Sequence, residues 1–220
     1  MQVAAVTGLA AEARILHRIG LAALATAGNG ERIAASVERL VAAGADGIAS
    51  FGIAGALAPG LKPGALLLPR RLRTEAGETF AVDPEWRERV RVKLVALKLA
   101  PLDGDLLAAN AIVAAPTHKA DLHRRLGAVA VDLESHRAEA AARAGGRKFL
   151  ALRAIADPAD FALPPAALVG IDSEGRAAAM KVLRAVLEVP GQVGALICLA
   201  LHTRSALRTL ARAAPALKEG

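Results

Sequence analysis

Acidic residues follow three apolar runs of the sequence, each short enough to be a buried β-strand. They are Glu12 after residues 2–7, Asp132 and Glu134 after residues 128–131, and Asp157 after residues 149–155. In sheets covered by helices, function collects at the carboxyl ends of strands. Carboxyl groups there can donate a proton, accept one or stabilise positive charge. Each acid alone could instead cap a helix or favour its dipole.

A glycine-rich run, residues 50–55 (SFGIAG), also follows an apolar stretch. Its small residues Gly52, Ala54 and Gly55 would let backbone amides approach an anion or a sugar. Ser50 opens the run and could bind the same ligand. The alternative is a tight turn that needs the backbone angles of glycine.

A second glycine-containing run, residues 28–33 (GNGERI), is similar to a dinucleotide-binding fingerprint. Ile33 stands where the third glycine is required, and the run does not follow the first strand. The sequence has no Gly-Lys-Ser/Thr phosphate loop, and its five histidines lack the spacing of zinc ligands. His136 follows the acidic cluster and fits a helix surface better than a ligand site. We therefore expect neither a dinucleotide cofactor nor a metal ion.

Apolar patterning places these residues on alternating strands and helices. Strands are expected at 2–7, 21–25, 47–50, 65–69, 111–113, 128–131 and 149–155, with a turn-rich run at 52–64. Helices are expected at 10–19, 31–43, 84–97, 117–126, 134–144, 173–187 and 192–211. This alternation favours an α/β fold, a single domain over residues 1–220 in which a central mixed sheet is flanked by helices. Its last part would be a basic helical segment, 173–212.

The composition narrows the class of protein. Hydrophobic residues make up 54% of the chain and aromatic residues 2%, so the core must consist mainly of Ala, Leu, Val and Ile. The single cysteine, Cys198, excludes an intramolecular disulfide and suits a reducing compartment. The N-terminus lacks the pattern of a secretory signal, and no apolar run approaches the ~20 residues that span a bilayer. We expect a cytoplasmic protein.

Positive charge collects at the C-terminal end. The net charge is +7, and residues 176–220 hold seven Lys or Arg against two Glu. The chain has no Tyr, four Phe and one Trp, which leaves few rings for stacking on bases and argues against nucleic-acid binding. The final helix carries basic residues at four-residue spacing and leucines elsewhere: Arg204, Arg208 and Arg212, with Leu196, Leu199, Leu207 and Leu210. Such a helix could touch an anionic membrane surface, or its leucines could pack on the domain while the arginines face water.

Taken together, four segments resemble the nucleoside phosphorylase family, which includes the methylthioadenosine/S-adenosylhomocysteine nucleosidases. They are VTGLAAEA (6–13), SFGIAGAL (50–57), AVDLES (130–135) and LRAIADPAD (152–160). With PPAAL (164–168), they look most like the hopanoid-associated phosphorylases of bacteria. That resemblance implies removal of adenine from adenosylhopane during the synthesis of hopanoid lipids.

The resemblance also implies roles for particular residues. Glu134 would bind the ribose hydroxyls beside Leu133, and Asp157 would donate a proton to the purine. Cleavage of an N-ribosidic bond builds positive charge on the sugar and negative charge on the base, so a carboxylate at the sugar and an acid at the base fit this reaction. Leu133 and Ala156 depart from the usual Met and Ser of the family.

The nucleophile is water, with Glu12 as its base, or phosphate. Glu12 lies one position nearer the glycine of the first strand than the water-activating Glu of typical nucleosidases. Arg14 is close to it in the sequence. These two features favour phosphate, which would be bound by a set of amides and one cation: Gly8, Arg14, Ser50 and Gly52.

No cofactor is expected apart from phosphate as a co-substrate. The expected partner is a purine nucleoside, linked to a lipid in the hopanoid case, and a second copy of the chain in a homo-oligomer. The alternatives are a nucleosidase of the methylthioadenosine/S-adenosylhomocysteine type and, from a different class, a non-enzymatic ligand-binding or membrane-associated module.

Overall fold

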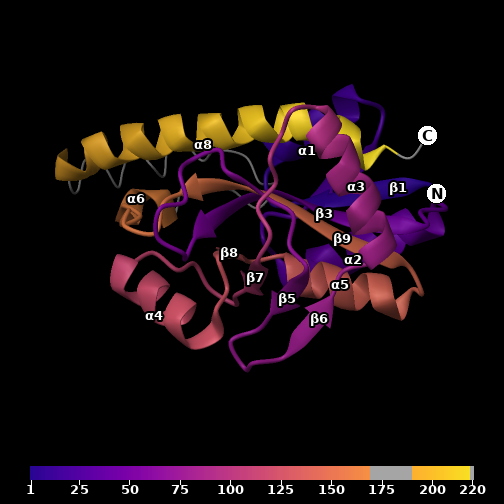
Figure 1. The fold of residues 1–220 in the computed structure, drawn as a ribbon, viewed down its shortest axis with the longest axis horizontal. Coiled ribbons are helices and arrows are strands. Elements are labelled where there is room, and N and C mark those ends of the chain that lie inside the picture. Colours follow the sequence, from indigo (N-terminus) through magenta and orange to yellow (C-terminus); the bar gives the residue numbers. More distant parts are fainter. Residues whose placement is uncertain (169–189, 219–220) are drawn as a thin grey trace.

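A mixed β-sheet runs through the centre of the protein, with helices on both faces (Figure 1). The computed structural model describes residues 1–168 and 190–218, so the helix expected at 173–187 lies outside the described residues. The strands are β1 (Val3–Thr7), β2 (Ala22–Ala25), β3 (Gly47–Ala56), β4 (Leu66–Leu67), β5 (Arg71–Arg73), β6 (Thr79–Ala81), β7 (Asp105–Ala108), β8 (Ala130–Asp132) and β9 (Lys148–Asp157). The helices are α1 (Ala10–Arg18), α2 (Gly30–Ala42), α3 (Pro84–Ala96), α4 (Pro116–Leu126), α5 (Ser135–Ala144), α6 (Pro165–Leu168) and α8 (Val193–Ala213), with 3₁₀ turns at Pro190–Gln192 and Ala214–Leu217.

Two long parallel strands, β3 and β9, form the spine of the sheet. The strand order is β2-β1-β3-β8-β7-β5-β6, and β9 pairs with β3 and β4. β1 runs parallel to β2 and β3, whereas β8 is antiparallel to the end of β3. The β3–β9 register shifts between Ala54 and Gly55, so Gly55 lies opposite Asp157. The carboxyl ends of β1, β3 and β9 therefore meet at one edge of the sheet.

Alternating residues of the central strands face two apolar clusters. On one face, β1, β3 and β9 pack against α1, α3 and α8 through residues such as Leu16, Trp86 and Leu210. On the other face, the same strands pack against α2 and α5 through residues such as Ile33 and Ala138. Because both faces are covered, the central strands are apolar on both sides, as parallel strands usually are.

The predicted fold class, an α/β domain with a mixed sheet between helices, is confirmed. The helices expected up to residue 144 lie within one or two residues of the observed ones, since caps and prolines mark their starts: Asn29 and Asp83 cap α2 and α3. The strand expected at 111–113 is wrong, because this segment forms a loop and the strand of this region is β7. β5 and β6 were not expected.

The turn expected to begin at Gly52 is also wrong at its start. β3 continues from Gly47 to Ala56, through the glycines of the run. These glycines lie in the strand because its neighbours need the space, as the site shows.

Candidate active site

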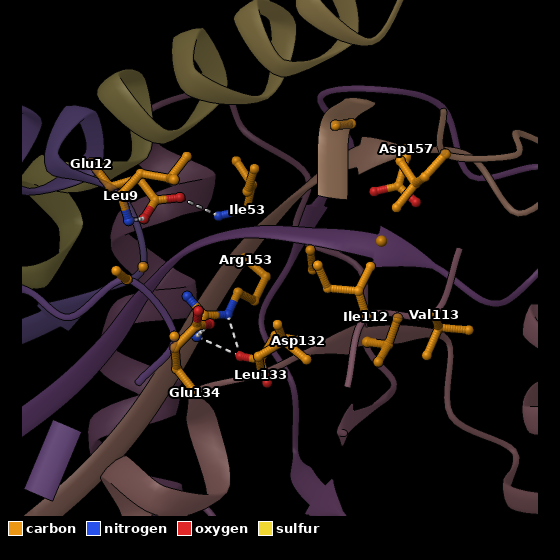
Figure 2. A pocket seen from close by; sticks show the side chains of 18 residues that line it. Leu9, Glu12, Ile53, Ile112, Val113, Asp132, Leu133, Glu134, Arg153 and Asp157 are labelled. Atoms are coloured by element: carbon orange, nitrogen blue, oxygen red, sulfur yellow. Dashed lines mark hydrogen bonds and ion pairs between the residues drawn. The ribbon is translucent and has the colours of Figure 1, made fainter. Parts of the chain in front are cut away.

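A pocket of about 340 Å³ lies at the edge of the sheet where β1, β3, β8 and β9 end. Figure 2 shows Glu12, Glu134, Asp132 and Arg153 on one side of it and Asp157 on the other. The remaining lining is largely apolar and small: Gly8, Leu9, Ala27, Gly28, Ile53, Ala54, Gly55, Ile112, Val113, Val131, Leu133, Leu163 and Ala167. The pocket thus brings together the three groups of acids that the sequence placed after separate strands.

Glycines make room for the charged groups of the pocket. A Cβ on Gly52 would lie 2.8 Å from Arg153 Nη1 and 2.8 Å from Glu12 Oε1. A Cβ on Gly55 would lie 2.9 Å from Asp157 Oδ2, and one on Gly8 would lie 2.8 Å from Glu134 Oε1. Since real Cβ atoms do not approach other atoms this closely, any side chain at these positions would displace the charged groups.

Glu12 is buried at the start of α1 and faces the pocket. Its Oε1 accepts a hydrogen bond from the backbone N–H of Ile53 at 2.8 Å, and its Oε2 accepts one from that of Leu9 at 2.8 Å. Burial raises the pKa of the Glu12 carboxyl, although these hydrogen bonds and the charge of Arg153 oppose the shift. A carboxylate whose pKa is raised is a stronger base, which suits proton abstraction from a nucleophile.

Arg153 is the buried cation on the side of the pocket that holds Glu12 and Glu134. Its Nε donates to Asp132 Oδ2 at 2.7 Å, and its Nη2 donates to the hydroxyls of Ser50 at 2.5 Å and Ser135 at 3.1 Å. Ser135 in turn donates to Asp132. Arg153 Nη1 is buried without a hydrogen-bond partner in the described part of the chain. A buried donor left unpaired is costly, so Nη1 is the unsatisfied group of this hydrogen-bond network.

Glu134 follows β8 and lies beside the same arginine. Its Oε2 is 3.6 Å from Arg153 Nη2. Burial raises the pKa of Glu134 to about 7, with Arg153 lowering it and the charges of Asp132 and Glu12 raising it. Glu134 therefore changes its charge near neutral pH.

Asp157 ends β9 on the opposite side of the pocket and forms an ion pair with a lysine. Lys119 Nζ of α4 lies 2.5 Å from Asp157 Oδ2, and the lysine side chain is fully buried. Ala156, where the family usually has Ser, is buried beside it. Asp157 is thus held by an ammonium group from another element.

The residues predicted from the sequence fall into three groups. Glu12, Glu134, Leu133, Asp157, Ala54, Gly55 and Gly8 line the pocket. Ser50 and Gly52 lie beneath it, against Arg153. Arg14 does not belong to it, because this side chain is exposed on the outer face of α1; the prediction of Arg14 as a phosphate ligand is corrected.

Sequence reasoning missed two charged residues of the site. Arg153 has a detectable signal, since a single charged residue inside the apolar run 149–155 must find partners when the strand is buried. Lys119 has none, because basic residues are common in the helix around it. The resemblance of 28–33 to a dinucleotide fingerprint is explained locally: the Asn29 side chain accepts from the Arg32 N–H and caps α2.

No group of three or more potential metal ligands occurs among residues 1–168 and 190–218. Over the same ranges, no helix has both the length and the apolar character needed to cross a bilayer.

Comparison with known proteins places this geometry in a family. Residues 14–189 match the Phosphorylase superfamily. No curated protein matches the sequence. The fold is similar to that of futalosine hydrolase from Helicobacter pylori strain 26695, at 12% identity and a TM-score of 0.73 over 98% of this chain and 96% of that one.

It is also similar to the 5′-methylthioadenosine/S-adenosylhomocysteine nucleosidase of Neisseria meningitidis in complex with methylthio-immucillin-A. The identity is 16% and the TM-score 0.72, over 99% of this chain and 98% of that one. At these identities the likeness establishes the fold, and the match over residues 14–189 establishes the family. The chain therefore belongs to the Phosphorylase superfamily, as an enzyme of the nucleoside phosphorylase or nucleosidase kind.

Proposed function

We propose that this enzyme hydrolyses the N-ribosidic bond of a purine nucleoside and releases the free base. Glu12 takes a proton from the attacking water, Glu134 holds the ribose hydroxyls, and Asp157 provides the proton that the leaving base needs. Positive charge that develops on the sugar is stabilised by the surplus of carboxylates beside it. Neither a metal nor an organic cofactor has a part in these steps.

The observation that carries water as nucleophile is the position of the Glu12 carboxylate. Its two oxygens accept from the backbone amides of Leu9 and Ile53 at 2.8 Å each, so these anion-binding donors are already used. Arg14 faces solvent, and Arg153 is paired with Asp132 and lies beside Glu134. A phosphate dianion would have to displace a carboxylate or lie among several of them, which is unfavourable because like charges repel. A neutral water molecule meets no such repulsion.

We further propose adenine as the base and an apolar substituent on the ribose. The resemblance to hopanoid-associated phosphorylases supports adenosylhopane as the substrate. The pocket supports a hydrophobic substituent, since aliphatic side chains line much of it and Ile112 is 46% exposed. Methylthioadenosine is the smaller substrate that the same lining would accept.

The exposed surface of α8 supports delivery of such a substrate from a membrane. Three apolar residues at four-residue spacing, Val193, Ile197 and Leu201, are 40%, 57% and 61% exposed. Arg204, Arg208 and Arg212 are exposed farther along the helix. The leucines that the sequence suggested for this face include Leu210, which is buried against the domain instead.

This surface begins next to the pocket. The side chain of Gln192, just before α8, accepts a hydrogen bond from the Ala166 N–H at 2.9 Å, and Ala167 lines the pocket. Figure 1 shows this end of α8 beside α6. In this proposal a cytoplasmic enzyme rests α8 on the inner face of the membrane while the pocket receives the adenosyl group.

The test is base release from a graded set of substrates. Adenosine, methylthioadenosine and adenosine with longer 5′-alkyl chains are each incubated with the enzyme, with and without phosphate, and free adenine is measured by chromatography. We expect adenine and free sugar in phosphate-free buffer, with kcat/KM rising as the alkyl chain lengthens. The Asp157→Asn variant is the control for contaminating activity.

Two results would contradict the proposal. If none of the substrates released adenine, the proposed reaction would be wrong. Release that depends strictly on phosphate, with a sugar 1-phosphate as product, would refute Glu12 as the base for water. A flat response to chain length would argue against a lipid-linked substrate only.

A further inference from the structure

A fully buried lysine touches the pocket from α4. Lys119 has 0% exposure, and its Nζ lies 2.5 Å from Asp157 Oδ2. Buried lysines are rare, because removing an ammonium group from water is costly unless it is paired. Here the partner is the proposed acid of the reaction, so the pair calls for an explanation beyond packing.

All three N–H groups of Lys119 are used. Besides Asp157, Nζ donates to the carbonyl oxygens of Pro158 and Phe161, at 3.0 Å each. These contacts fix the ammonium against the turn that follows β9. The lysine therefore cannot bind substrate itself, and any effect on the reaction must pass through Asp157.

The Asp157 carboxyl is held between this ammonium and the backbone of Gly55. A Cβ on Gly55 would lie 2.9 Å from Oδ2 and 3.2 Å from Oδ1, so the carboxyl lies flat against the glycine. Oδ2 accepts from Lys119, while Oδ1 accepts no hydrogen bond within the described residues. One oxygen is thus fixed and the other is left for a ligand in the pocket.

Among the described residues, no other ionisable side chain forms a hydrogen bond or an ion pair with Lys119 or Asp157. Glu12, Glu134 and Arg153 lie across the pocket (Figure 2). From α8, the ring of His202 packs against that of Phe161, with 5.4 Å between ring centroids, and its Nε2 lies 3.4 Å from Cys198 Sγ. Lys119 is therefore the charged group that contacts Asp157 in the described part of the chain.

We propose, on the basis of the proposed function, that Lys119 positions Asp157 and supplies the proton that Asp157 passes to the leaving base. The Lys119 ammonium gives a proton to the Asp157 carboxylate and becomes a neutral amine. When the bond between the base and C1′ breaks, its electron pair enters the purine ring, and a ring nitrogen takes this proton from Asp157, which returns to the carboxylate form. At the sugar, water forms the new bond to C1′ and Glu12 takes its proton, which solvent later returns to the lysine.

The proposal predicts the sign of a pH effect. An ammonium group keeps its proton to a much higher pH than a carboxyl group does. A shared proton stored on Lys119 would keep the enzyme active into the alkaline range. If Lys119 only stabilised the Asp157 carboxylate, its removal would make Asp157 hold its own proton more tightly and would extend activity to higher pH.

The experiment compares pH–rate profiles of the wild type and Lys119→Met. We expect the alkaline limb of kcat to move to lower pH by about one unit or more, with a loss at alkaline pH of about tenfold for each unit of the shift, which largely disappears in acid. Lys148→Met is the matched control, because Lys148 forms an ion pair with Asp83 at 3.2 Å away from the pocket. The control should keep the wild-type profile.

If the alkaline limb of the Lys119→Met profile stays in place or moves to higher pH, the inference is overturned. The proposed function still stands in that case, provided that the wild type releases the base. No base release by the wild type overturns both. If Lys119→Met does not fold, Lys119→Met/Asp157→Asn removes both charges and is compared with Asp157→Asn alone. Equal residual rates are expected, because the lysine acts through Asp157; a further loss of about tenfold or more refutes that path.

Discussion

The pocket has a side that holds Asp157, where the proposal puts the base, and a side that holds Glu12, Glu134 and Arg153, where it puts the sugar. We call them the base side and the sugar side. Both bury charged groups, but the groups find their partners in different ways. On the base side, Asp157 faces a single lysine whose three N–H groups all have partners. On the sugar side, Asp132 and Glu134 share one arginine with the nearby Glu12, and Arg153 Nη1 has no partner in the described residues. On the base side every N–H of the lysine has a partner, whereas the sugar side holds an unpaired donor and three carboxyl groups around one arginine. This difference supports the proposal that the ribose hydroxyls and the developing cation bind on the sugar side.

Loss of the proposed acid should have the largest effect. Asp157→Asn keeps the size of the side chain but removes the proton donor and the charge that Lys119 pairs with, so kcat should fall by roughly 10²–10⁴-fold. The measurement is steady-state base release by a variant whose circular dichroism matches the wild type. Turnover near the wild-type level would show that the base side takes no part in the chemistry.

Loss of Glu12, the proposed acceptor of the proton of water, should lower kcat by a factor similar to, or slightly smaller than, that for loss of Asp157. Glu12→Gln removes the proton acceptor, so hydrolysis should slow by about 10²–10⁴-fold, and added phosphate should not restore it. Rates with and without phosphate check this. A variant that hydrolyses normally would assign water activation elsewhere on the sugar side.

The raised pKa of Glu134 should also make the free energy of unfolding depend on pH. Folded Glu134 keeps its proton up to a pH of about 7, whereas the unfolded chain loses it near 4.5. Between these values the folded state binds more protons, so the stability is present below about pH 4.5 and is lost as the pH rises through 7. The loss should be roughly 3 kcal/mol, measured by urea denaturation.

Glu134→Gln is the control for this pH dependence. The variant has no proton to lose, so its free energy of unfolding should be flatter over the same range. An equal slope in the two proteins would assign the titration to another residue.

A smaller effect should separate ribosides from 2′-deoxyribosides. If Glu134 binds the hydroxyls, Glu134→Gln should cost about 1–3 kcal/mol in kcat/KM on the riboside and less on the deoxyriboside, which has already lost one partner. The ratio of the two losses is the readout. Equal losses would move sugar recognition to another part of the pocket.

The smallest effect per residue is expected outside the pocket, at the arginines of α8. Replacing Arg204, Arg208 and Arg212 by Gln should weaken binding to anionic vesicles by about 1 kcal/mol per residue, and salt should weaken wild-type binding in the same way. Co-sedimentation with anionic and neutral vesicles measures it, with base release from soluble adenosine as the control that should not change. Binding that ignores lipid charge would leave α8 a structural helix.

The sequence predicts the parts of this molecule that depend on local pattern. The starts of α2 and α3 follow from Asn29 and Asp83 as caps, and the acids after three strands do line one pocket. The sequence does not predict the features that depend on contacts between segments far apart in the chain. β5 is three residues with arginine at both ends, which has no apolar alternation to detect.

The same limit explains the errors at the site. Gly52 and Gly55 read as turn residues, but they lie in a strand because Arg153 and Asp157 on β9 need the space beside them. Arg14 is near Glu12 in the sequence but points away from it, because the helix turns its side chain to solvent. Lys119 becomes visible only when α4 is placed against the end of β9.

The central claim is that water, activated on the sugar side by Glu12, attacks C1′ of a purine nucleoside. The most direct measurement is a single turnover in H₂¹⁸O with phosphate present, followed by mass spectrometry of the sugar. We expect free base and a sugar that carries ¹⁸O at C1′, with no sugar 1-phosphate. A sugar 1-phosphate without the label, or no cleavage at all, would contradict the account.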